Sequence, residues 1–268
     1  MPPRNFTVSH GIGRMKVLRQ LLFAVLGSFL GLNSTGAVEL KFVAEPFPPF
    51  VFEVAGTQAA TGPLVEVTMA VCERIKAHCS VDIYPWRRAL EMAEHGLVDG
   101  MFPLVPTQER EKLFHLSAAV VTSAASFFVQ ESSAFKYTQP SDLDRYSIGV
   151  YGPSANSMLV GETLKSGSTG RMEIELNNIT VLRKLSVGRY GDTNRGVAVV
   201  NKHVGQYLIK SEKITGIQYG GDLKKVSFSI AFPRKKVTDG QFQEFNTALK
   251  SMTREGKLRA ILEKYEIR

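Results

Sequence analysis

The side chains best suited to catalysis are too scattered in this chain to form a recognisable catalytic motif. No two of its five histidines have the spacing of metal ligands on one helix. The stretch Gly152-Pro-Ser-Ala-Asn156 breaks the Gly-x-Ser-x-Gly pattern of a serine nucleophile, and glycine patterns for phosphate or dinucleotide binding do not occur. The sequence therefore predicts a protein that is not an enzyme and that holds neither a metal nor a cofactor.

Side chains of the kind that recognise small molecules instead follow the ends of predicted strands. These candidate ligand-binding residues are Glu45, Phe47, Trp86, Arg88, Thr107, Arg110, Ser154 and Asn201. In open α/β sheets ligands bind at the carboxyl ends of strands, so we expect these side chains to converge on one cleft.

Hydrophobic periodicity predicts two successive runs of alternating strands and helices. In the first run, strands are expected at 38–43, 81–84 and 98–105, and helices around 64–75, 86–94 and 107–111. In the second run, strands are expected at 146–151, 172–176 and 196–200, and helices from 154, at 180–187 and at 202–210. Extended segments at 120–130 and 225–232 follow the two runs, and two amphipathic helices end the chain. The alternation predicts an α/β fold with largely parallel sheets in two lobes.

Residues 1–37 have the features of an export signal. Lys16 and Arg19 precede an uncharged apolar run, Leu21–Leu32, and small residues follow it up to Ala37. The run is shorter than the roughly 20 apolar residues that span a bilayer, which favours a signal peptide over an uncleaved membrane anchor. Met15 is an alternative start, because a signal that begins MKVLRQ is more conventional. We therefore expect an exported, soluble, periplasmic protein.

The basic excess of the chain belongs in part to this segment. The 268 residues carry 33 Lys and Arg against 25 Asp and Glu, a net charge of +8. Residues 1–37 hold four of the basic residues and none of the acidic ones, so the remainder carries +4. Because this charge is mild and dispersed, we expect no binding to nucleic acid. We also expect a monomer.

The chain has two cysteines: Cys72 lies late in a predicted helix, and Cys79 lies after it, just before the next predicted strand. In a reducing cytosol they would be buried thiols, but export favours a disulfide between them. Such a bridge pins the helix end to the strand, which is a structural role.

Several segments occur in the order and spacing of a known family. The first half carries PFPPFVFE, TGPLVEV, AVCERIKAHC, YPWRRALEMAEHGLVDG, PTQERE and FHLS, and the tail carries EFNTALKSMTREGKLRAILEKY. Together they resemble the family 3 solute-binding proteins of bacterial polar amino-acid ABC transporters. The resemblance implies a type 2 periplasmic-binding fold, with lobe 1 at 38–125 plus 228–268, lobe 2 at 126–227, and two crossover strands between them. Ligand would lie between the lobes, which close by hinge bending.

The resemblance gives roles to candidates in the first half of the chain. Arg110 follows a Thr-x-x pattern, and the family's arginine there grips the ligand carboxylate through two parallel hydrogen bonds. Judged from its acidic neighbours alone, Arg110 would be a surface residue. Thr107 would add a hydroxyl donor or cap the turn, and Phe47 would form an aromatic wall or pack on Phe50.

Trp86 and Arg88 fit a Trp-x-Arg pattern of one branch of the family. Trp86 would stack on the ligand or a cation, or belong to the core, and Arg88 would face the cleft or solvent. Glu45 would pair with an ammonium group or remain an exposed loop acid. Ser154 would donate to an anionic group at a helix N-terminus, or only cap that helix.

Asn201 is the main departure from the family's pattern. Amino-acid binders of the family place an aspartate at the end of a second-lobe strand to hold the ammonium, and Asn201 stands at the corresponding position without a charge. A buried ammonium without a carboxylate partner is costly. Either Glu45 supplies that charge, or the ligand is not a standard α-amino acid.

Three functions follow from these observations. The first, which the sequence favours, is a periplasmic protein that delivers a small amino-acid-like or anionic solute to a membrane ABC permease. The second is an enzyme on the same scaffold, such as a dehydratase of a cyclic carboxylic acid with Glu45 as its acid. The third is a protein that presents its ligand to a membrane sensory receptor.

Overall fold

The computed structural model describes residues 1–3, 5, 38–57, 59–191 and 195–267, and the described residues from 38 onward form one compact unit. Most of the predicted export signal lies outside the described residues, so the signal peptide and the start at Met15 remain predictions. Within the described part of the chain, no helix combines the length and apolarity needed to cross a membrane.

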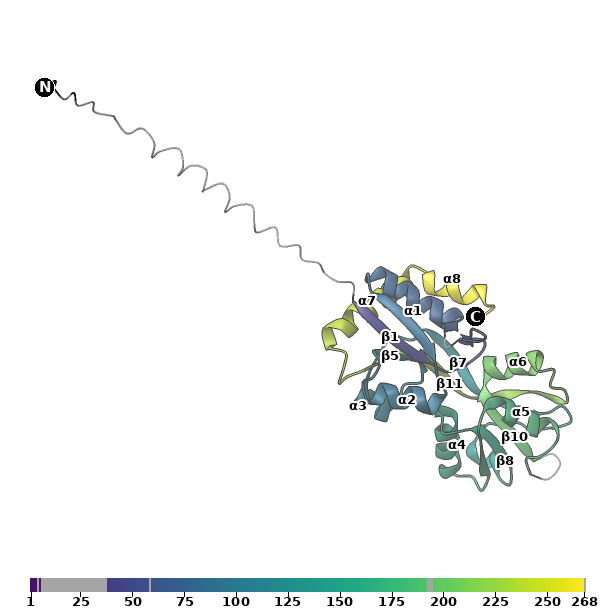
Figure 1. Cartoon of the computed structure of the whole chain (residues 1–268). Helices are drawn as coiled ribbons and strands as arrows, with labels where there is room; N and C mark the ends of the chain where they lie inside the picture. Colours follow the sequence, from purple (N-terminus) through teal and green to yellow (C-terminus); the bar gives the residue numbers. More distant parts are fainter. Residues whose placement is uncertain (4, 6–37, 58, 192–194, 268) are drawn as a thin grey trace. The chain divides into compact units, whose positions relative to one another are not determined.

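The main sheet consists of two groups of parallel strands joined through two long antiparallel strands (Figure 1). In spatial order the strands are β4 (His78–Ile83), β1 (Glu39–Ala44), β5 (Gly100–Leu104), β11 (Ile217–Pro233), β7 (Val121–Gln130), β10 (Gly196–Asn201), β8 (Ser147–Tyr151) and β9 (Arg171–Glu175). β1 pairs in parallel with β4 and β5, and β8 pairs in parallel with β9 and β10. β7 and β11 pair with each other in antiparallel fashion and link the groups. The α/β class is confirmed, but the sheet is parallel only within each group.

Helices cover both faces of each group (Figure 1). The first lobe comprises β1, β4 and β5 with α1 (Pro63–Arg74), α2 (Trp86–Glu94), α3 (Gln108–Leu113), α7 (Asp239–Arg254) and α8 (Lys257–Lys264). The second lobe comprises β8, β9 and β10 with α4 (Ala155–Lys165), α5 (Asn178–Ser186), α6 (Lys202–Ser211) and the 3-10 turn η1 (Pro140–Leu143). The predicted lobe boundaries, 125/126 and 227/228, fall inside β7 and β11 and remain a prediction.

Helix α1 begins where the sequence predicts, directly after Gly62. A glycine is needed at this position because the loop that contains Phe50 passes close to it. Gly62 has φ 113°, a left-handed conformation that favours glycine, and an added Cβ would lie 2.9 Å from the Phe50 carbonyl oxygen. Pro63 follows at the first helical position, where its missing N–H costs nothing. The loop that carries Glu45 and Phe47 is thereby held against the start of α1.

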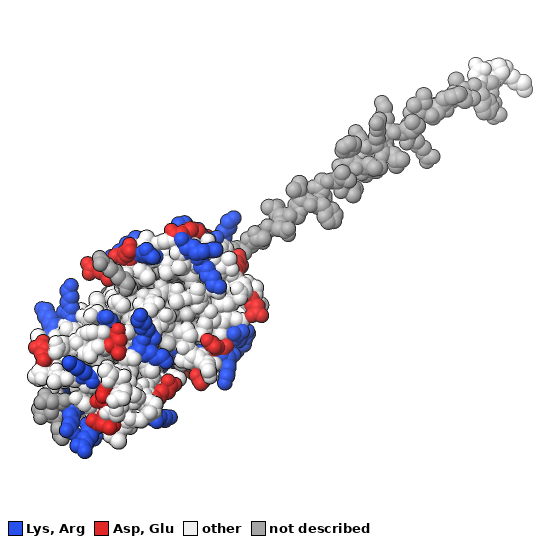
Figure 2. Space-filling model, turned by 180° about the vertical axis from the view of Figure 1, so that it is seen from behind, with Lys and Arg blue, Asp and Glu red and all other residues white. Residues whose placement is uncertain are grey.

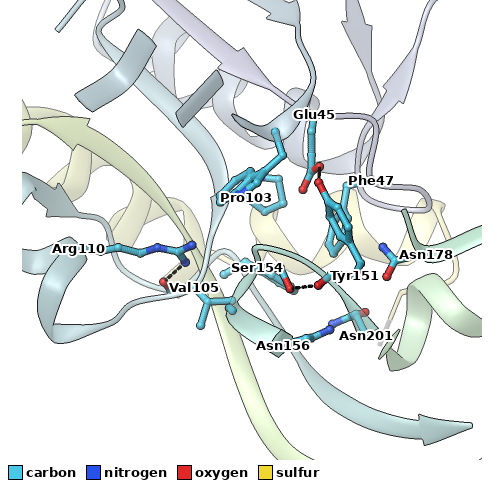
Figure 3. A pocket seen from close by; sticks show the side chains of 13 residues that line it. Glu45, Phe47, Pro103, Val105, Arg110, Tyr151, Ser154, Asn156, Asn178 and Asn201 are labelled. Atoms are coloured by element: carbon cyan, nitrogen blue, oxygen red, sulfur yellow. Dashed lines mark hydrogen bonds between the residues drawn. The ribbon is translucent and has the colours of Figure 1, made fainter. Parts of the chain in front are cut away.

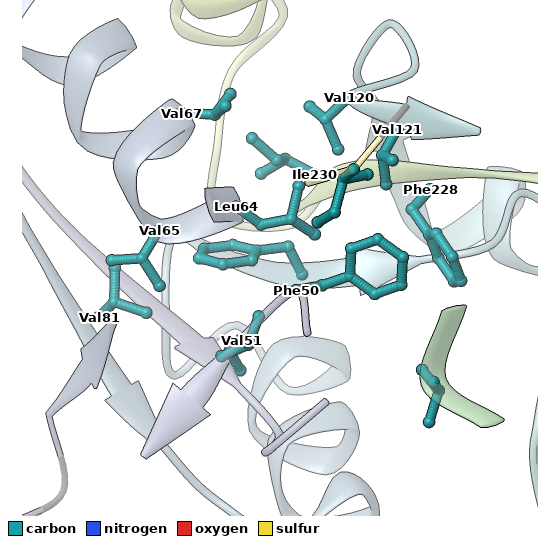
Figure 4. Close-up of a cluster of buried hydrophobic side chains, with 14 of the residues drawn as sticks. Phe50, Val51, Leu64, Val65, Val67, Val81, Val120, Val121, Phe228 and Ile230 are labelled. Atoms are coloured by element: carbon teal, nitrogen blue, oxygen red, sulfur yellow. The ribbon is translucent and has the colours of Figure 1, made fainter. Parts of the chain in front are cut away.

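The alternating pattern of β10 explains how the second lobe is layered. Val197 and Val199 belong to one buried cluster with Val160 of α4, whereas Ala198 and Val200 belong to the cluster that includes residues of α5 and α6. Because successive side chains of a strand point to opposite faces, one strand serves both layers. In the first lobe the corresponding core gathers around Phe50 and continues to β7 and β11 (Figure 4).

The structure joins Cys72 to Cys79 in a disulfide, as predicted, with an S–S distance of 2.06 Å. The bridge connects α1 to β4. Cys72 lies in the last turn of α1 and Cys79 near the start of β4, so the bridge pins the helix end to the strand at the edge of the sheet opposite the carboxyl ends that carry the site residues.

Some short elements were not predicted. They are β2 (Phe52–Glu53), β3 (Ala60–Thr61) and β6 (Phe114–Leu116). β11 also begins at Ile217, well before the expected start at 225, and its first part pairs with β7 through two irregular steps. This part is stabilised by pairing with a distant strand rather than by its own pattern.

Candidate functional site

A pocket between the two lobes collects side chains from the carboxyl ends of the parallel strands (Figure 3). This central pocket is lined by Glu45, Phe47, Trp86, Pro103, Val105, Arg110 and Phe228, and by Tyr151, Ser154, Ala155, Asn156, Asn178 and Asn201. The first set lies at or after the ends of β1, β4 and β5, or on β11. The second set lies at or after the ends of β8, β9 and β10. In both lobes, therefore, the pocket lies at the carboxyl ends of parallel strands, where open α/β sheets bind ligands. We call this preference the strand-end rule.

Arg110 lies on the first-lobe wall with its guanidinium held from two sides. Its Nη1 donates to the carbonyl oxygen of Val105 at 2.7 Å, and its guanidinium carbon lies 5.4 Å from the centre of the Trp86 ring. Burial lowers the pKa of Arg110, an effect opposed by the charges of Glu94 and Glu45. An arginine stays charged under such conditions. The remaining N–H groups therefore form a fixed cationic fork that suits a carboxylate.

Trp86 is both a core residue and the partner of a cation, which the sequence offered as alternatives. The side chain is 8% exposed and belongs to a buried cluster beneath α2, yet its ring also lines the pocket and carries Arg110. An aromatic ring of this kind holds a cation over its face in a fixed orientation.

Glu45 reaches from the end of β1 toward the second lobe. The hydroxyl of Tyr151, at the end of β8, donates to Glu45 Oε2 at 3.5 Å (Figure 3). Burial raises the pKa of Glu45 to about 8, against the opposing effects of the Tyr151 hydrogen bond and the Arg110 charge. At neutral pH this carboxyl group is therefore mostly protonated and able to donate a hydrogen bond.

The raised pKa of Glu45 predicts how stability depends on pH. Between its ordinary pKa near 4.5 and about 8, the folded protein keeps a proton that the unfolded chain has released. Raising the pH through this window therefore weakens the folded state by up to about 1.4 kcal/mol per pH unit. Urea unfolding at pH 5 and pH 9 should show a smaller loss in Glu45→Gln than in the wild type.

A matched control for this experiment is Glu244→Gln, which changes an exposed glutamate of α7. It should show the wild-type loss of stability between the two pH values. Equal losses in the wild type and Glu45→Gln would contradict the assignment of a partly buried, protonated carboxyl group.

The apolar wall of the pocket is a stack of aromatic rings. The Phe47 ring lies 5.7 Å from that of Phe50, nearly parallel to it, and 5.5 Å from that of Phe228. Phe47 thus packs as its loop requires and still presents part of its surface to the pocket. Phe228 comes from β11, so this wall also connects the site to the strand that links the lobes.

The second-lobe wall is built from helix N-termini. Ser154 caps α4: its Oγ accepts from Ser157 N and donates to the carbonyl oxygen of Tyr151 at 2.6 Å. Asn201 caps α6 through Oδ1, which accepts from Val204 N. Asn178 is the first residue of α5. The hydroxyl of Ser154 is therefore engaged in capping, while the helix ends supply positive partial charge.

Two of the eight predicted residues do not line the central pocket. Thr107 caps α3, accepting from Arg110 N at 3.3 Å, and faces a neighbouring pocket. Arg88 points to solvent and pairs with Glu91, with 55% of its side chain exposed. The buried face of α2 runs through Trp86 and Ala89, and Arg88 lies on the other face. The placement of Arg88 in the cleft was therefore wrong.

Three polar pocket residues were not singled out from the sequence: Tyr151, Asn156 and Asn178. Tyr151 is the last residue of a predicted strand, so the strand-end rule would have found it. Asn178 was missed because the helix was predicted from 180, whereas it begins at Asn178 after an Asn177 cap.

Two wider pockets adjoin the central one. The central pocket has a free volume of about 50 Å³, whereas a pocket that shares Glu45, Trp86 and Tyr151 with it has about 680 Å³. A third, which shares Val105 and Ala155, has about 610 Å³. A ligand of amino-acid size therefore extends into one of these neighbours, or binds with the lobes slightly farther apart.

The surface outside the cleft has no dominant sign on the face seen in Figure 2. Basic and acidic side chains of the described residues are interspersed over that face. A mixed surface of this kind does not steer a polyanion toward the protein.

The sequence as a whole matches one protein family. The model of the bacterial extracellular solute-binding proteins, family 3, covers residues 40–267, so the chain belongs to this family. The resemblance found in the sequence is confirmed. A comparison with curated protein sequences gives no match.

Solved structures share the type 2 periplasmic-binding fold. A substrate-binding protein of an amino-acid ABC transporter from Streptococcus pneumoniae, bound to L-arginine, is 17% identical, with a TM-score of 0.70 over 85% of this chain and 94% of that one. A histidine kinase sensor domain is 16% identical, with a TM-score of 0.73 over 85% and 96%. An ancestral amino-acid-binding protein, a precursor of cyclohexadienyl dehydratase, is 18% identical, with a TM-score of 0.69 over 85% and 94%. At these identities the likeness establishes the fold.

Proposed function

We propose that this protein is a periplasmic solute-binding protein that captures a small amino-acid-like or organic-anion ligand in the central pocket for a membrane ABC permease. The observation that carries this proposal is Arg110, whose guanidinium is fixed by Val105 and Trp86 on the wall of a pocket between two lobes. In this proposal Arg110 binds the ligand carboxylate, and Phe47 and Trp86 form the apolar wall.

The two long strands supply the motion that capture needs. β7 and β11 pair with each other and with strands of both lobes, so bending within them changes the distance between the pocket walls. The predicted boundaries at 125/126 and 227/228 place the hinge in these strands. Closure removes the ligand from water and strengthens its charge-assisted hydrogen bonds.

Glu45 supports a second candidate function. A protonated carboxyl group beside a carboxylate clamp is the general acid that loss of water from a hydroxy acid requires. One neighbour in fold is described as a precursor of a dehydratase. Incubation with a cyclic hydroxy-carboxylic acid tests this function. Turnover that Glu45→Gln abolishes would support an enzyme, and no rate above background supports the binding protein.

Thermal unfolding of the purified protein against amino acids, polyamines and small organic acids tests the main proposal. A ligand at a hundred times its dissociation constant adds about 2.7 kcal/mol, which raises the unfolding midpoint of a protein of this size by roughly 5–11 °C. We expect such a rise with one class of carboxylate and none with polyamines. A rise with polyamines alone, or with no compound, would contradict the proposal. Presentation to a sensory receptor predicts the same binding, and neighbouring permease or receptor genes distinguish the two roles.

A further inference from the structure

The second-lobe wall of the central pocket is a convergence of three helix N-termini. α4, α5 and α6 each follow one of the parallel strands β8, β9 and β10, so their first turns gather at one edge of the sheet. Ser154, Asn156, Asn178 and Asn201 lie at these helix starts and line the pocket. Helix N-termini carry positive partial charge and unpaired N–H groups, so this wall attracts hydrogen-bond acceptors and anions.

Asn201 adds a second and independent observation. The residue is 2% exposed, and its Nδ2 is the one buried side-chain nitrogen or oxygen among the described residues that has no hydrogen-bond partner. An unpaired buried donor is costly, so such groups are rare unless something else pairs with them. Because Asn201 lines the pocket, a ligand is the natural source of the missing acceptor.

The orientation of the Asn201 amide is fixed by its other partners. Its Oδ1 accepts from Val204 N at 3.3 Å and from Ser123 Oγ at 3.1 Å. Val204 N is a backbone donor at the start of α6, so it can pair only with the oxygen. Turning the amide over would leave that donor facing an NH₂ group. Nδ2 is therefore the amide atom that is left without a partner, on a residue that lines the pocket.

The position of Ser123 is itself held from the opposite side. Ser123 Oγ lies 2.7 Å from His203 Nδ1, and the His203 ring packs against Phe50 at 5.7 Å in an edge-on arrangement. Burial and the neighbouring Lys202 lower the pKa of His203, so its ring is neutral at pH 7. The chain from His203 through Ser123 to Asn201 keeps the amide in one orientation.

The charges around the pocket agree with an acceptor at Asn201. Among its lining residues only Arg110 and Glu45 are of charged types, and Glu45 is mostly protonated at neutral pH. Two second-lobe carboxylates, Asp222 and Glu175, do not line the pocket. Asp222 accepts from Ser126 and Tyr219, and Glu175 accepts from Lys184 and Tyr190. An α-ammonium group would find no ionised partner among these side chains, whereas an oxygen would find donors.

We infer that the ligand directs an acceptor oxygen to Asn201 Nδ2, and that the protein prefers 2-hydroxy and 2-oxo carboxylic acids to α-amino acids of the same carbon skeleton. The inference rests on the proposed function, because it assumes that a small carboxylate is held by Arg110 in the central pocket.

Matched sets of compounds that differ only at C2 test this preference by isothermal titration. Suitable sets are L-alanine with L-lactate and pyruvate, L-glutamate with L-2-hydroxyglutarate and 2-oxoglutarate, and L-phenylalanine with L-phenyllactate and phenylpyruvate. In the best-binding set we expect the oxygen compounds to bind at least tenfold more tightly than the amino acid. Asn201→Asp keeps the size of the side chain and the acceptor for Val204 N, so it should reverse this ratio.

The control variant is Gln206→Glu, which adds the same charge at an exposed position of α6. It should leave the ratio within about threefold of the wild type. Tighter binding of the amino acid by the wild type, or a ratio that Asn201→Asp leaves unchanged, would overturn the inference while leaving the proposed function intact. Binding of no compound in any set would overturn the proposed function itself, and the inference with it.

Discussion

Replacing Arg110 with alanine should weaken ligand binding by a factor of about 100 to 10,000. The side chain offers two parallel hydrogen bonds to a carboxylate, and each hydrogen bond to a charged group is worth about 1.5–3 kcal/mol. Each tenfold change in affinity corresponds to about 1.4 kcal/mol, so the loss of two such bonds lowers affinity by at least two powers of ten. Isothermal titration of Arg110→Ala with the ligand identified by thermal unfolding measures this loss.

The stability of the unliganded protein should change far less. Arg110→Ala removes one hydrogen bond to Val105 O and one contact with Trp86, together worth about 1–2 kcal/mol. Arg110→Lys should fall between alanine and the wild type in affinity, because it keeps the charge and loses the planar fork.

The exposed Arg88, two residues after Trp86, provides the matched control. Its guanidinium pairs with Glu91 at the surface of α2, so Arg88→Ala should bind within about twofold of the wild type. Equal losses of affinity in the two variants would show that overall positive charge, and not a carboxylate clamp, attracts the ligand. Failure of Arg110→Ala to fold would make Arg110 a structural residue.

Replacing Phe42 with alanine should have the largest effect on stability, a loss of about 3–5 kcal/mol in the free energy of unfolding. Phe42 lies on β1, is 1% exposed, and packs against Phe102, Phe232 and Phe245 at ring distances of 6.2, 5.7 and 6.0 Å. The surrounding sheet cannot close around the lost ring, so a cavity remains. Urea unfolding measures the change.

Leu97→Ala is the control for this prediction. Leu97 is 59% exposed, so its truncation should alter the free energy of unfolding by no more than about 0.5 kcal/mol. A loss below about 1.5 kcal/mol in Phe42→Ala would show that the first-lobe core is looser than its packing indicates.

Much of the fold could be predicted because local patterns and tertiary packing agree. The helix at 86–94 was predicted with the bounds that the structure gives it, since the buried positions of α2 repeat at helical spacing and Gly96 follows its end. Strands β1, β5 and β8 carry enough buried apolar residues to be recognised alone.

The elements that were missed depend on distant partners. The first part of β11, from Ile217 to Lys224, contains Gly220 and Gly221 and has few buried residues, so its sequence is not typical of a strand. It is extended because β7 pairs with it along its length. The two-residue strands β2 and β3 are likewise too short to have a pattern of their own.

The site could be predicted only as far as the strand-end rule and the family resemblance reach. They predicted Glu45, Arg110 and Asn201, which the structure places on the wall of the central pocket. They placed Arg88 wrongly, because a Trp-x-Arg pattern does not say which face of the helix the arginine occupies. Contacts across the lobes, such as Tyr151 to Glu45, depend on how the lobes meet, and no local pattern encodes that.

The protonated state of Glu45 was also beyond the sequence. Its place in a proline-rich loop predicted an exposed acid or a partner for an ammonium group. Burial between the lobes instead raises the pKa of Glu45 to about 8. The sequence left open whether Glu45 supplies the charge that Asn201 lacks or the ligand is not a standard α-amino acid. The raised pKa of Glu45 favours the second alternative, because its carboxyl group is mostly uncharged at neutral pH.

The fluorescence of Trp86 tests the central claim most directly. The chain contains one tryptophan, and its ring lines the central pocket beneath the Arg110 guanidinium. We expect the carboxylate that raises the unfolding temperature to change the emission of Trp86 in a saturable manner, at the concentrations that calorimetry gives, and Arg110→Ala to abolish this change. A ligand that stabilises the protein but leaves the emission of Trp86 unaltered at saturation would contradict binding in the central pocket.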